Sequence, residues 1–248
     1  MNKFIDLHSH IAWGIDDGIE NKENSIEALK MANQDGIVGI CSTPHIVPGK
    51  IDEMAFKTIL QRQYSLLELA QNFNIFVYSG AEMMMNIDFM DAINQDLYLT
   101  LNESRYILVE FDLRWDIHFM PYIFEYLEEL VFRSFVPVIA HIERYFPEDL
   151  DLDLIDQFLD IGCLLQSNRT SLLGYHGKNI QKNAMKLLEN KKIHLICSDA
   201  HRSTGRRIEK LSDVYQVIKQ KFGVHNANLL CFYNPYSILD NKETENMV

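Results

Sequence analysis

Histidine and acidic side chains recur in short motifs along the whole chain. His8-Ser9-His10 begins the series and Asp199-Ala200-His201 ends it. Residues two apart in a strand lie on the same face, so both rings of a His-x-His motif can reach one ion. Imidazole and carboxylate groups without thiolates are typical ligands of Zn, Mn or Fe. The two motifs therefore predict a metal-dependent hydrolase.

Seven short apolar runs with strand character recur at roughly 30-residue intervals. They are residues 4–7, 38–41, 75–78, 106–109, 136–139, 163–166 and 194–197. Helix-like stretches lie between them, for example at residues 24–34, 54–73 and 119–132. Apolar strands that alternate with helices predict a parallel sheet, and seven such units favour an α/β barrel over an open sheet. We expect one domain over residues 1–248, with a polar tail at 240–248 that frays.

The candidate ligands fall where these apolar runs end. His8 and His10 follow the first run, His45 the second, Glu82 the third, Glu110 the fourth, His141 the fifth, and Asp199 with His201 the seventh. The strands of a (β/α) barrel point their carboxyl ends to one face, where such enzymes keep their active sites. Side chains from both ends of the chain are therefore expected to converge. They exceed what one ion can use, which predicts two or three divalent metal ions.

A ninth ligand candidate lies in the loop after the first run. Asp17 belongs to Gly14-Ile15-Asp16-Asp17-Gly18, which also has the composition of a tight turn, and one residue can serve both purposes. The remaining histidines do not follow a predicted strand and are assigned to the core or the surface: His118, His176, His194 and His225.

Two arginines lie close behind histidines of the series. Arg144 follows His141 and Arg206 follows His201, in loops on the expected active face. A planar guanidinium binds phosphate oxygens in a bidentate manner, so this pair predicts a phosphate ester as the substrate. Arg207 is the alternative to Arg206.

A competing phosphatase motif is present and is rejected. Cys163 and Arg169 have the Cys-x5-Arg spacing of cysteine-based phosphatases. That chemistry requires a thiolate in a loop of backbone amides ahead of a helix, whereas the residues after Cys163 form a buried strand pattern. The cysteines are expected to be reduced and buried, because none forms a Cys-x-x-Cys pair.

Charge and hydropathy exclude two other classes of function. The chain has 23 Lys plus Arg against 35 Asp plus Glu, a formal net charge of −12, which makes nucleic acid a poor partner. No signal peptide or membrane-spanning run is found, so a cytoplasmic location is expected. The same acidity repels anionic substrates at long range, so any phosphate must be held by local metals and arginines.

Seven motifs together resemble the PHP (polymerase and histidinol phosphatase) superfamily. They are residues 4–10, 14–18, 42–45, 80–82, 109–110, 140–145 and 198–201. Within the superfamily they are most similar to the bacterial manganese-dependent tyrosine-protein phosphatases of capsule and exopolysaccharide operons, the CpsB/YwqE type. Residues 166–168, 171–174 and 234–235 extend the similarity over almost the whole chain.

The resemblance implies a distorted (β/α)7 TIM-like barrel that binds three metal ions, with Mn expected and Fe or Zn as alternatives. The implied ligands are His8, His10, Glu82 and Asp199 for the first ion, Glu82, Glu110 and His141 for the second, and Asp17, His45 and His201 for the third. Arg144 and Arg206 match the phosphate-binding arginines. The implied substrate is phosphotyrosine on the C-terminal tail of a bacterial tyrosine kinase, attacked in line by a metal-held hydroxide.

Two other functions remain open at this point. A small-molecule phosphatase, such as one for histidinol phosphate, would share nearly every ligand. A metal-stabilised regulatory module without turnover would keep the ligands but has no need of both arginines. The sequence carries no pattern that predicts an oligomeric state.

Overall fold

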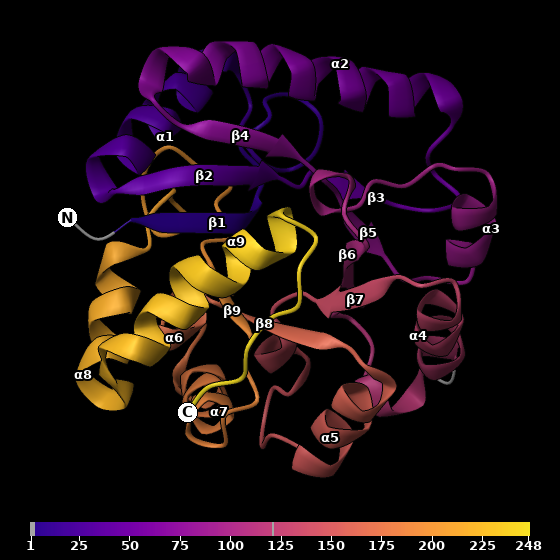
Figure 1. Cartoon of the computed structure of the whole chain (residues 1–248). Helices are drawn as coiled ribbons and strands as arrows, with labels where there is room; N and C mark the ends of the chain where they lie inside the picture. Colours follow the sequence, from indigo (N-terminus) through magenta and orange to yellow (C-terminus); the bar gives the residue numbers. More distant parts are fainter. Residues whose placement is uncertain (1–2, 121) are drawn as a thin grey trace.

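Strands and helices alternate along the chain, and the helices surround the strands (Figure 1). The computed structural model describes residues 3–120 and 122–248. The strands are β1 (Phe4–Ser9), β2 (Ile37–Ser42), β3 (His45–Ile46), β4 (Phe76–Ser79), β5 (Glu82–Met84), β6 (Tyr106–Glu110), β7 (Val136–Ile139), β8 (Leu164–Asn168) and β9 (Leu195–Cys197). The α-helices are α1 (Lys22–Asp35), α2 (Glu53–Ala70), α3 (Phe89–Asn94), α4 (Tyr122–Phe132), α5 (Leu152–Ile161), α6 (Arg169–Leu172), α7 (Lys178–Glu189), α8 (Ser212–Asn228) and α9 (Asn234–Leu239). Shorter helical turns are η1 (Gln71–Phe73), η2 (Leu101–Glu103), η3 (Ile117–Phe119), η4 (Ile142–Tyr145) and η5 (Leu229–Tyr233).

The nine strands of the described residues form a closed parallel barrel with seven positions, here called staves, each of which holds one strand or two short strands in line. The pairing orders are β1-β2-β4 and β3-β5-β6-β7-β8-β9, and every pair is parallel. A parallel bridge between Ser9 and Ala200 joins the first stave to the last. The fold predicted from the sequence, a distorted (β/α)7 barrel, is confirmed.

The second and third positions of the barrel are each formed by two short strands in line, the second of which lies outside the predicted runs, and this is the distortion of the barrel. The second stave consists of β2 and β3, separated at Pro44, whose missing N–H cannot pair with a neighbouring strand. The third consists of β4 and β5, separated at Gly80, where a Cβ atom would lie 2.8 Å from Sγ of Cys41. Each break lies directly before a predicted ligand, His45 or Glu82, so the chain is redirected where it enters the site.

Alternation along the strands divides the barrel interior into an apolar and a polar layer. In β6, Tyr106 and Leu108 point into the barrel, while Ile107 and Val109 pack outward against the helices. The next inward position is Glu110, which is buried. Apolar side chains thus fill the amino-terminal part of the barrel, and the carboxyl end is left for polar groups.

The amino-terminal end of the barrel is closed by the last helix. Ile238 and Leu239 of α9 belong to the same buried cluster as the inward residues Ile5, Leu108 and Leu195. Figure 1 shows α9 in yellow across the front of the strands. The barrel is therefore solid at this end and open for chemistry only at the other.

Helix boundaries follow local capping signals. Asn21 caps α1, where its side chain accepts from the N–H of Asn24, and Gly36 ends the helix with a φ of 96°. The predicted helix at 119–132 begins later than expected, because Phe119 belongs to the separate turn η3. Position 121 lies outside the described residues.

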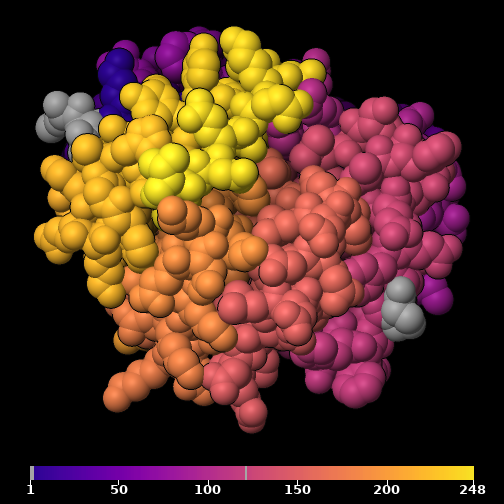
Figure 2. Space-filling view, turned by 60° about the horizontal axis from the view of Figure 1, so that its bottom comes forward, coloured from indigo at the N-terminus to yellow at the C-terminus, as the bar shows by residue number. Residues whose placement is uncertain are grey.

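The expectation that residues 240–248 fray is wrong. The segment contains no helix or strand, but hydrogen bonds tie it to the body of the protein at several points, among them Oη of Tyr106, which donates to the backbone oxygen of Lys242. The side chain of Asn234 pairs with the backbone of Glu245, and that of Asn226 pairs with the backbone of Val248. Met247 is buried, and Figure 2 shows the yellow C-terminal residues packed on the surface. The asparagine side chains thus supply the hydrogen-bond partners that the backbone of this segment would otherwise lack.

Candidate metal centre

The predicted ligands converge at the carboxyl end of the barrel. The structure contains three sets of residues, and within each set the potential ligand atoms lie within 4.8 Å of one another. They are His8, His10 and Glu82; His45, Glu82 and Glu110; and His10, Asp17, His45 and His201. Three compact groups of imidazole and carboxylate atoms fit two or three divalent ions.

Glu82 occupies the centre of the cluster. Its Oε2 lies 3.1 Å from Nε2 of His8, 3.1 Å from Nε2 of His10 and 3.2 Å from Nδ1 of His45. Its Oε1 lies 2.9 Å from Nε2 of His141. One carboxylate therefore contacts four imidazoles, the arrangement expected of a ligand shared between ions.

The two rings of the His-x-His motif present their lone pairs to each other. Nδ1 of His8 donates to Oε1 of Gln166, and Nδ1 of His10 donates to Oδ2 of Asp16. These bonds place the proton of each neutral ring on Nδ1 and leave both Nε2 atoms without a hydrogen. The two Nε2 atoms lie only 3.2 Å apart. Two converging lone pairs at this distance call for a cation between them and Glu82.

A chain of amides behind the ligands fixes their orientation. The backbone N–H of His141 donates to Oε1 of Gln166, which identifies this atom as the oxygen. Nε2 of Gln166 donates to Oδ1 of Asn168, and Nδ2 of Asn168 donates to Oδ2 of Asp199. The sequence similarity covers both amides but assigns them no role. Their position two apart at the end of β8, the one stave without a ligand, was the available signal.

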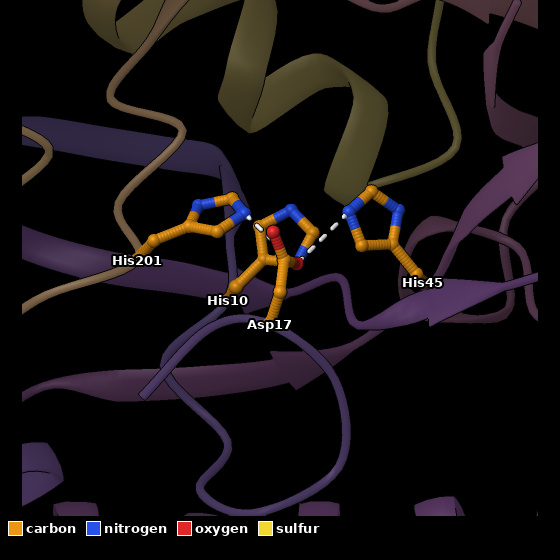
Figure 3. Close-up of side chains that lie close together, drawn as sticks. All are labelled: His10, Asp17, His45 and His201. Atoms are coloured by element: carbon orange, nitrogen blue, oxygen red, sulfur yellow. Dashed lines mark ion pairs between the residues drawn. The ribbon is translucent and has the colours of Figure 1, made fainter. Parts of the chain in front are cut away.

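Asp17 lies between two imidazoles at the rim of the cluster (Figure 3). Its Oδ1 lies 3.4 Å from Nε2 of His45 and 3.5 Å from Nε2 of His201, with the ring of His10 beside them. Nη1 of Arg202 donates to the backbone oxygen of Asp17 and holds the loop in place. Hydrogen bonds from His201 and His45 keep the pKa of Asp17 far below its usual range. The neighbouring Asp16 turns inward and binds His10, so the two residues have different tasks.

Burial and neighbouring carboxylates act in opposite directions on the imidazoles of the cluster. Burial lowers the pKa of His8, but the carboxylates of Glu82 and Asp199 outweigh burial and raise it to about 9. The same competition, with Glu82 as the strongest attraction, raises the pKa of His45 to about 12. The buried carboxylates therefore favour positive charge among the imidazoles, which bound metal ions would supply.

Several buried atoms of the cluster have no hydrogen-bond partner among the described residues. They include Nδ1 of His45, Oε1 of Glu110 and Nδ1 of His141. The first two lie 2.9 Å apart without hydrogen-bond geometry. Buried polar atoms without partners are rare in proteins, and atoms at metal sites are an established exception. The donor set and these unpaired atoms fit bound divalent ions.

The ligand grouping differs in three respects from that implied by the resemblance: His10 joins the set of Asp17, His45 and His201, Asp199 is outside the set of His8, His10 and Glu82, and His45 takes the place of His141. His45 joins Glu82 and Glu110, whereas His141 contacts the cluster through Glu82 at 2.9 Å and Glu110 at 3.9 Å. Asp199 lies 3.6 Å from Nε2 of His8. The assignment of each ligand to a particular ion remains a prediction.

Two of the ligands have a strained backbone. His141 has a φ of 36° and Asp199 a φ of 52°, in the left-handed region that residues with a Cβ rarely adopt. Each residue lies two positions after the end of its strand and turns its side chain toward the cluster. Backbone strain of this kind gathers at functional sites, where surrounding contacts enforce it.

The predicted arginines differ in their contacts. Nη1 of Arg144 lies 3.7 Å from Oδ2 of Asp199. Nη2 of Arg207 lies 2.8 Å from Oδ1 of Asp199 and 3.0 Å from Nε2 of His201. Arg206 points elsewhere, with its guanidinium 5.4 Å from the ring centre of Tyr175. Arg144 and Arg207, rather than Arg206, therefore face the metal cluster in this structure.

A hollow of about 410 Å³ lies beside His201 on the arginine side of the cluster. Its lining includes Arg206, Arg207, Tyr175 and His176. Burial lowers the pKa of His176 to about 4, so this ring is neutral near pH 7. The sequence reading left His176 out of the site, since it does not follow a strand.

The cysteine-based alternative is excluded by the environment of its thiol. Cys163 is buried, and burial raises the pKa of its thiol to about 12. Arg169 is bound to the carboxylate of Asp213 through Nε at 2.8 Å and Nη2 at 2.7 Å. A thiol that stays neutral cannot act as the nucleophile of a cysteine-based phosphatase, and a guanidinium paired with Asp213 cannot bind the phosphate. All four cysteines are free and buried, as predicted.

Among the described residues, no helix combines the length and the apolar composition that crossing a bilayer requires.

Residues 4–240 match the family described as "Capsular polysaccharide synthesis, CpsB/CapC". The chain belongs to the CpsB/CapC family. The chain is 30% identical to the tyrosine-protein phosphatase CpsB of Streptococcus pneumoniae, over 95% of this chain and 98% of that protein. It is 29% identical to the tyrosine-protein phosphatase YwqE of Bacillus subtilis, over 96% and 90% of the two chains. The resemblance found in the motifs is confirmed.

Solved structures agree with this membership. A structure from a study of YwqE from Bacillus subtilis and CpsB from Streptococcus pneumoniae, described as unique metal-dependent tyrosine phosphatases, superposes with a TM-score of 0.86. It has 27% sequence identity, and the match covers 98% of this chain and 96% of that one. The histidinol phosphate phosphatase of Lactococcus lactis, at 16% identity and a TM-score of 0.55, shares the fold. CpsB/CapC proteins and that enzyme are thus built on one architecture.

Proposed function

We propose that this chain is a metal-dependent protein-tyrosine phosphatase that uses two or three divalent ions, with Mn expected and Fe or Zn as alternatives. The observation that carries the proposal is the contact of Glu82 with four imidazoles beside two arginines that reach Asp199. The activities named for the CpsB and YwqE relatives support the same reaction.

Bound ions would lower the pKa of a coordinated water toward neutrality and offset the negative charge of the phosphate. The chain itself supplies the geometry. Gln166 and Asp16 hold the tautomers of His8 and His10, so that Nε2 of each ring is available to a ligand. Asn168 orients Asp199 through a 2.7 Å hydrogen bond. The site is therefore assembled before the substrate arrives.

The arginines account for phosphate binding by so acidic a chain. Arg144 lies near Oδ2 of Asp199, and Arg207 donates to Oδ1 of the same carboxylate. Both guanidinium groups therefore lie beside the cluster, where a bound phosphate ester needs positive charge. We propose that they bind the equatorial oxygens of the transferring group, where charge is spread in the transition state. Local charge then outweighs the net charge of −12. The leaving tyrosinate, with a pKa of about 10, needs less help from a general acid than an alkoxide would.

The substrate protein is a finer proposal and rests on family membership. The family is named for capsular polysaccharide synthesis, and its relatives are named as tyrosine-protein phosphatases. We infer a phosphotyrosine-containing protein in the cytoplasm as the partner, with the C-terminal tail of a tyrosine kinase of the capsule system as the first candidate.

The decisive experiment compares substrates in the presence of Mn²⁺. Purified without chelator, the protein should contain divalent metal by elemental analysis and hydrolyse a phosphotyrosyl peptide with a higher kcat/KM than histidinol phosphate. A preference for histidinol phosphate would reverse the proposal in favour of a small-molecule phosphatase. Turnover of neither substrate by the metal-replete protein would indicate a regulatory module.

A further inference from the structure

A loop at the rim of the metal centre exposes large apolar side chains. It runs from the end of β6 through η3 and includes Trp115, which is 67% exposed, and Phe119, which is 79% exposed. Leu113 of the same loop and Ile87 of a neighbouring one are also exposed. Single exposed apolar residues are normal, but several on one rim mark an interaction surface.

The loop that carries these residues is held by specific contacts. Ile117 is buried and anchors its far end. At the near end, the N–H of Phe111 donates to Oη of Tyr145 over 2.9 Å. Between them, Nε of Arg114 donates to Oδ1 of Asp112 over 2.8 Å, and the N–H of Trp115 donates to the backbone oxygen of Asp112. The exposed aromatic groups are thus presented by an organised loop, which lowers the entropic cost of binding.

Two hollows flank the loop. One, of about 520 Å³, is lined by Trp115, Phe119 and Ile87. The other, of about 650 Å³, is lined by Leu113 and Trp115 and extends to Arg144. Nη1 of Arg144 also lies 3.7 Å from Oδ2 of Asp199 in the metal centre, so one residue adjoins both the second hollow and the site. Trp115 belongs to both hollows and forms the ridge between them.

We propose that this surface, defined by Leu113, Trp115, Phe119 and Ile87, binds the polypeptide on either side of the phosphotyrosine, and favours aromatic or large aliphatic residues there. The inference rests on the proposed function and deepens it, because it distinguishes a phosphotyrosyl polypeptide from a small phosphate ester. A phosphotyrosine held by Arg144 would direct its flanking residues into the adjoining hollow. Apolar side chains at those positions then bury against Trp115, as aromatic residues do at the centre of many interfaces.

A peptide fits this surface better than a second copy of the chain does. A stable protein interface needs about 20–30 residues from each side. The surface offers four large apolar side chains and two separate hollows, which suit a short extended segment. The rim also carries charges of both signs, among them Arg114, Asp116 and Glu148, that can pair with a peptide backbone and its polar side chains.

The test uses the metal-replete protein and three substrates: free phosphotyrosine, a phosphotyrosyl peptide with Phe and Leu flanks, and the same peptide with Ala and Gly flanks. For the wild type, kcat/KM should be about tenfold higher for the apolar-flanked peptide than for the Ala and Gly peptide. Trp115→Ala should remove most of this ratio through KM. Phe132→Ala is the matched control, because Phe132 is 84% exposed and lies in neither hollow, and its ratio should equal that of the wild type.

Each contrary result has its own meaning. Equal kcat/KM for the two peptides, or a Trp115→Ala variant that keeps the wild-type ratio, would overturn the docking proposal. A dimer in sedimentation that Trp115→Ala converts to monomers, with an unaltered ratio, would assign the surface to a second copy. Failure of the wild type to hydrolyse even free phosphotyrosine would instead reject the proposed function. In that case fluorescence titration with the unphosphorylated apolar peptide still measures docking, and the lack of a Trp115-dependent signal would reject it too.

Discussion

The side-chain oxygen of Gln166 lies 3.1 Å from Nδ1 of His8 and 2.8 Å from the backbone nitrogen of His141. One amide thus sets the tautomer of one ligand and the backbone position of another. Because the N–H of His141 can only donate, the amide cannot flip without losing this bond, and the proton of His8 stays on Nδ1.

Replacement of this amide should weaken metal binding. Gln166→Leu removes the acceptor for His8 and the donor for Asn168, so the ring of His8 and the carboxylate of Asp199 lose their fixed orientation. We expect Mn²⁺ affinity to fall by about 10–100-fold, measured by isothermal titration calorimetry. Gln157→Leu on the exposed side of α5 is the control and should bind as the wild type does. Equal affinity for both variants would remove Gln166 from the support of the site.

Removal of the ions should destabilise the protein. Glu82, Glu110 and Asp199 are buried together, and only cations or protons relieve their repulsion. At a free ion concentration about 1,000 times Kd, the bound ion stabilises the native state by about 4 kcal/mol, so a chelator should lower Tm measurably. His8→Ala should lose metal content and activity together, whereas the exposed His225→Ala should lose neither. A Tm unaffected by chelator would argue against structural coupling of the ions.

The two adjacent arginines should differ in their contribution to catalysis. Arg207 contacts Asp199 and His201, while Arg206 lies over Tyr175. Arg207→Ala should lower kcat/KM for free phosphotyrosine by about 10²–10³-fold, the usual cost of one transition-state donor, with metal still bound. Arg206→Ala should cost less than about tenfold in the same assay. The reverse order would return the phosphate clamp to Arg206, as the motif alone suggested.

Acid should destabilise the protein through a histidine far from the metal centre. Burial lowers the pKa of His194 to about 4, and its Nδ1 accepts from the N–H of Leu165 over 3.1 Å. Below pH 6.5, His194 binds a proton in the unfolded chain, whereas in the native state it stays neutral until the pH approaches 4. The free energy of unfolding therefore falls as the pH falls from 6.5 toward 4. The loss between pH 7 and pH 5 should be about 2 kcal/mol from this residue.

Denaturant unfolding of the wild type and of His194→Gln checks this expectation. The glutamine can still accept a hydrogen bond but does not titrate. The difference in unfolding free energy between the two proteins should therefore shrink as the pH is lowered from 7 to 5. A constant difference would mean that His194 is protonated in the native state as easily as in the unfolded chain.

The barrel and its ligands were predictable because they depend on local periodicity. In β6, the alternation of Tyr106, Leu108 and Glu110 is visible in the sequence, and it places the carboxylate at the open end of the barrel. The same logic located Glu82 and His141, although their strand ends are short or strained. Strand ends of a parallel barrel meet at one face whatever the loops do.

Contacts that depend on loop conformation could not be predicted from the sequence. Nothing in the order of Gly205, Arg206 and Arg207 indicates which guanidinium turns toward Asp199, because that depends on the φ of 87° at Gly205 and on the path of the loop. The polar composition of residues 240–248 predicted a frayed tail, and composition could not reveal its amide pairs with Asn226 and Asn234. Long-range partners of this kind leave no periodic signal.

Closure of the barrel between its first and last strands has a consequence for how the chain folds. Asp6 accepts from the N–H of Ser198, and the N–H of His10 donates to the backbone oxygen of Ala200, so β1 gains its second neighbour only when the end of the chain is available. On the ribosome the ligand-bearing first strand must wait as an open edge until most of the sequence has been made. Such non-local pairing raises the contact order and slows folding. The centre that carries the chemistry is thus the last part of the barrel that synthesis can complete.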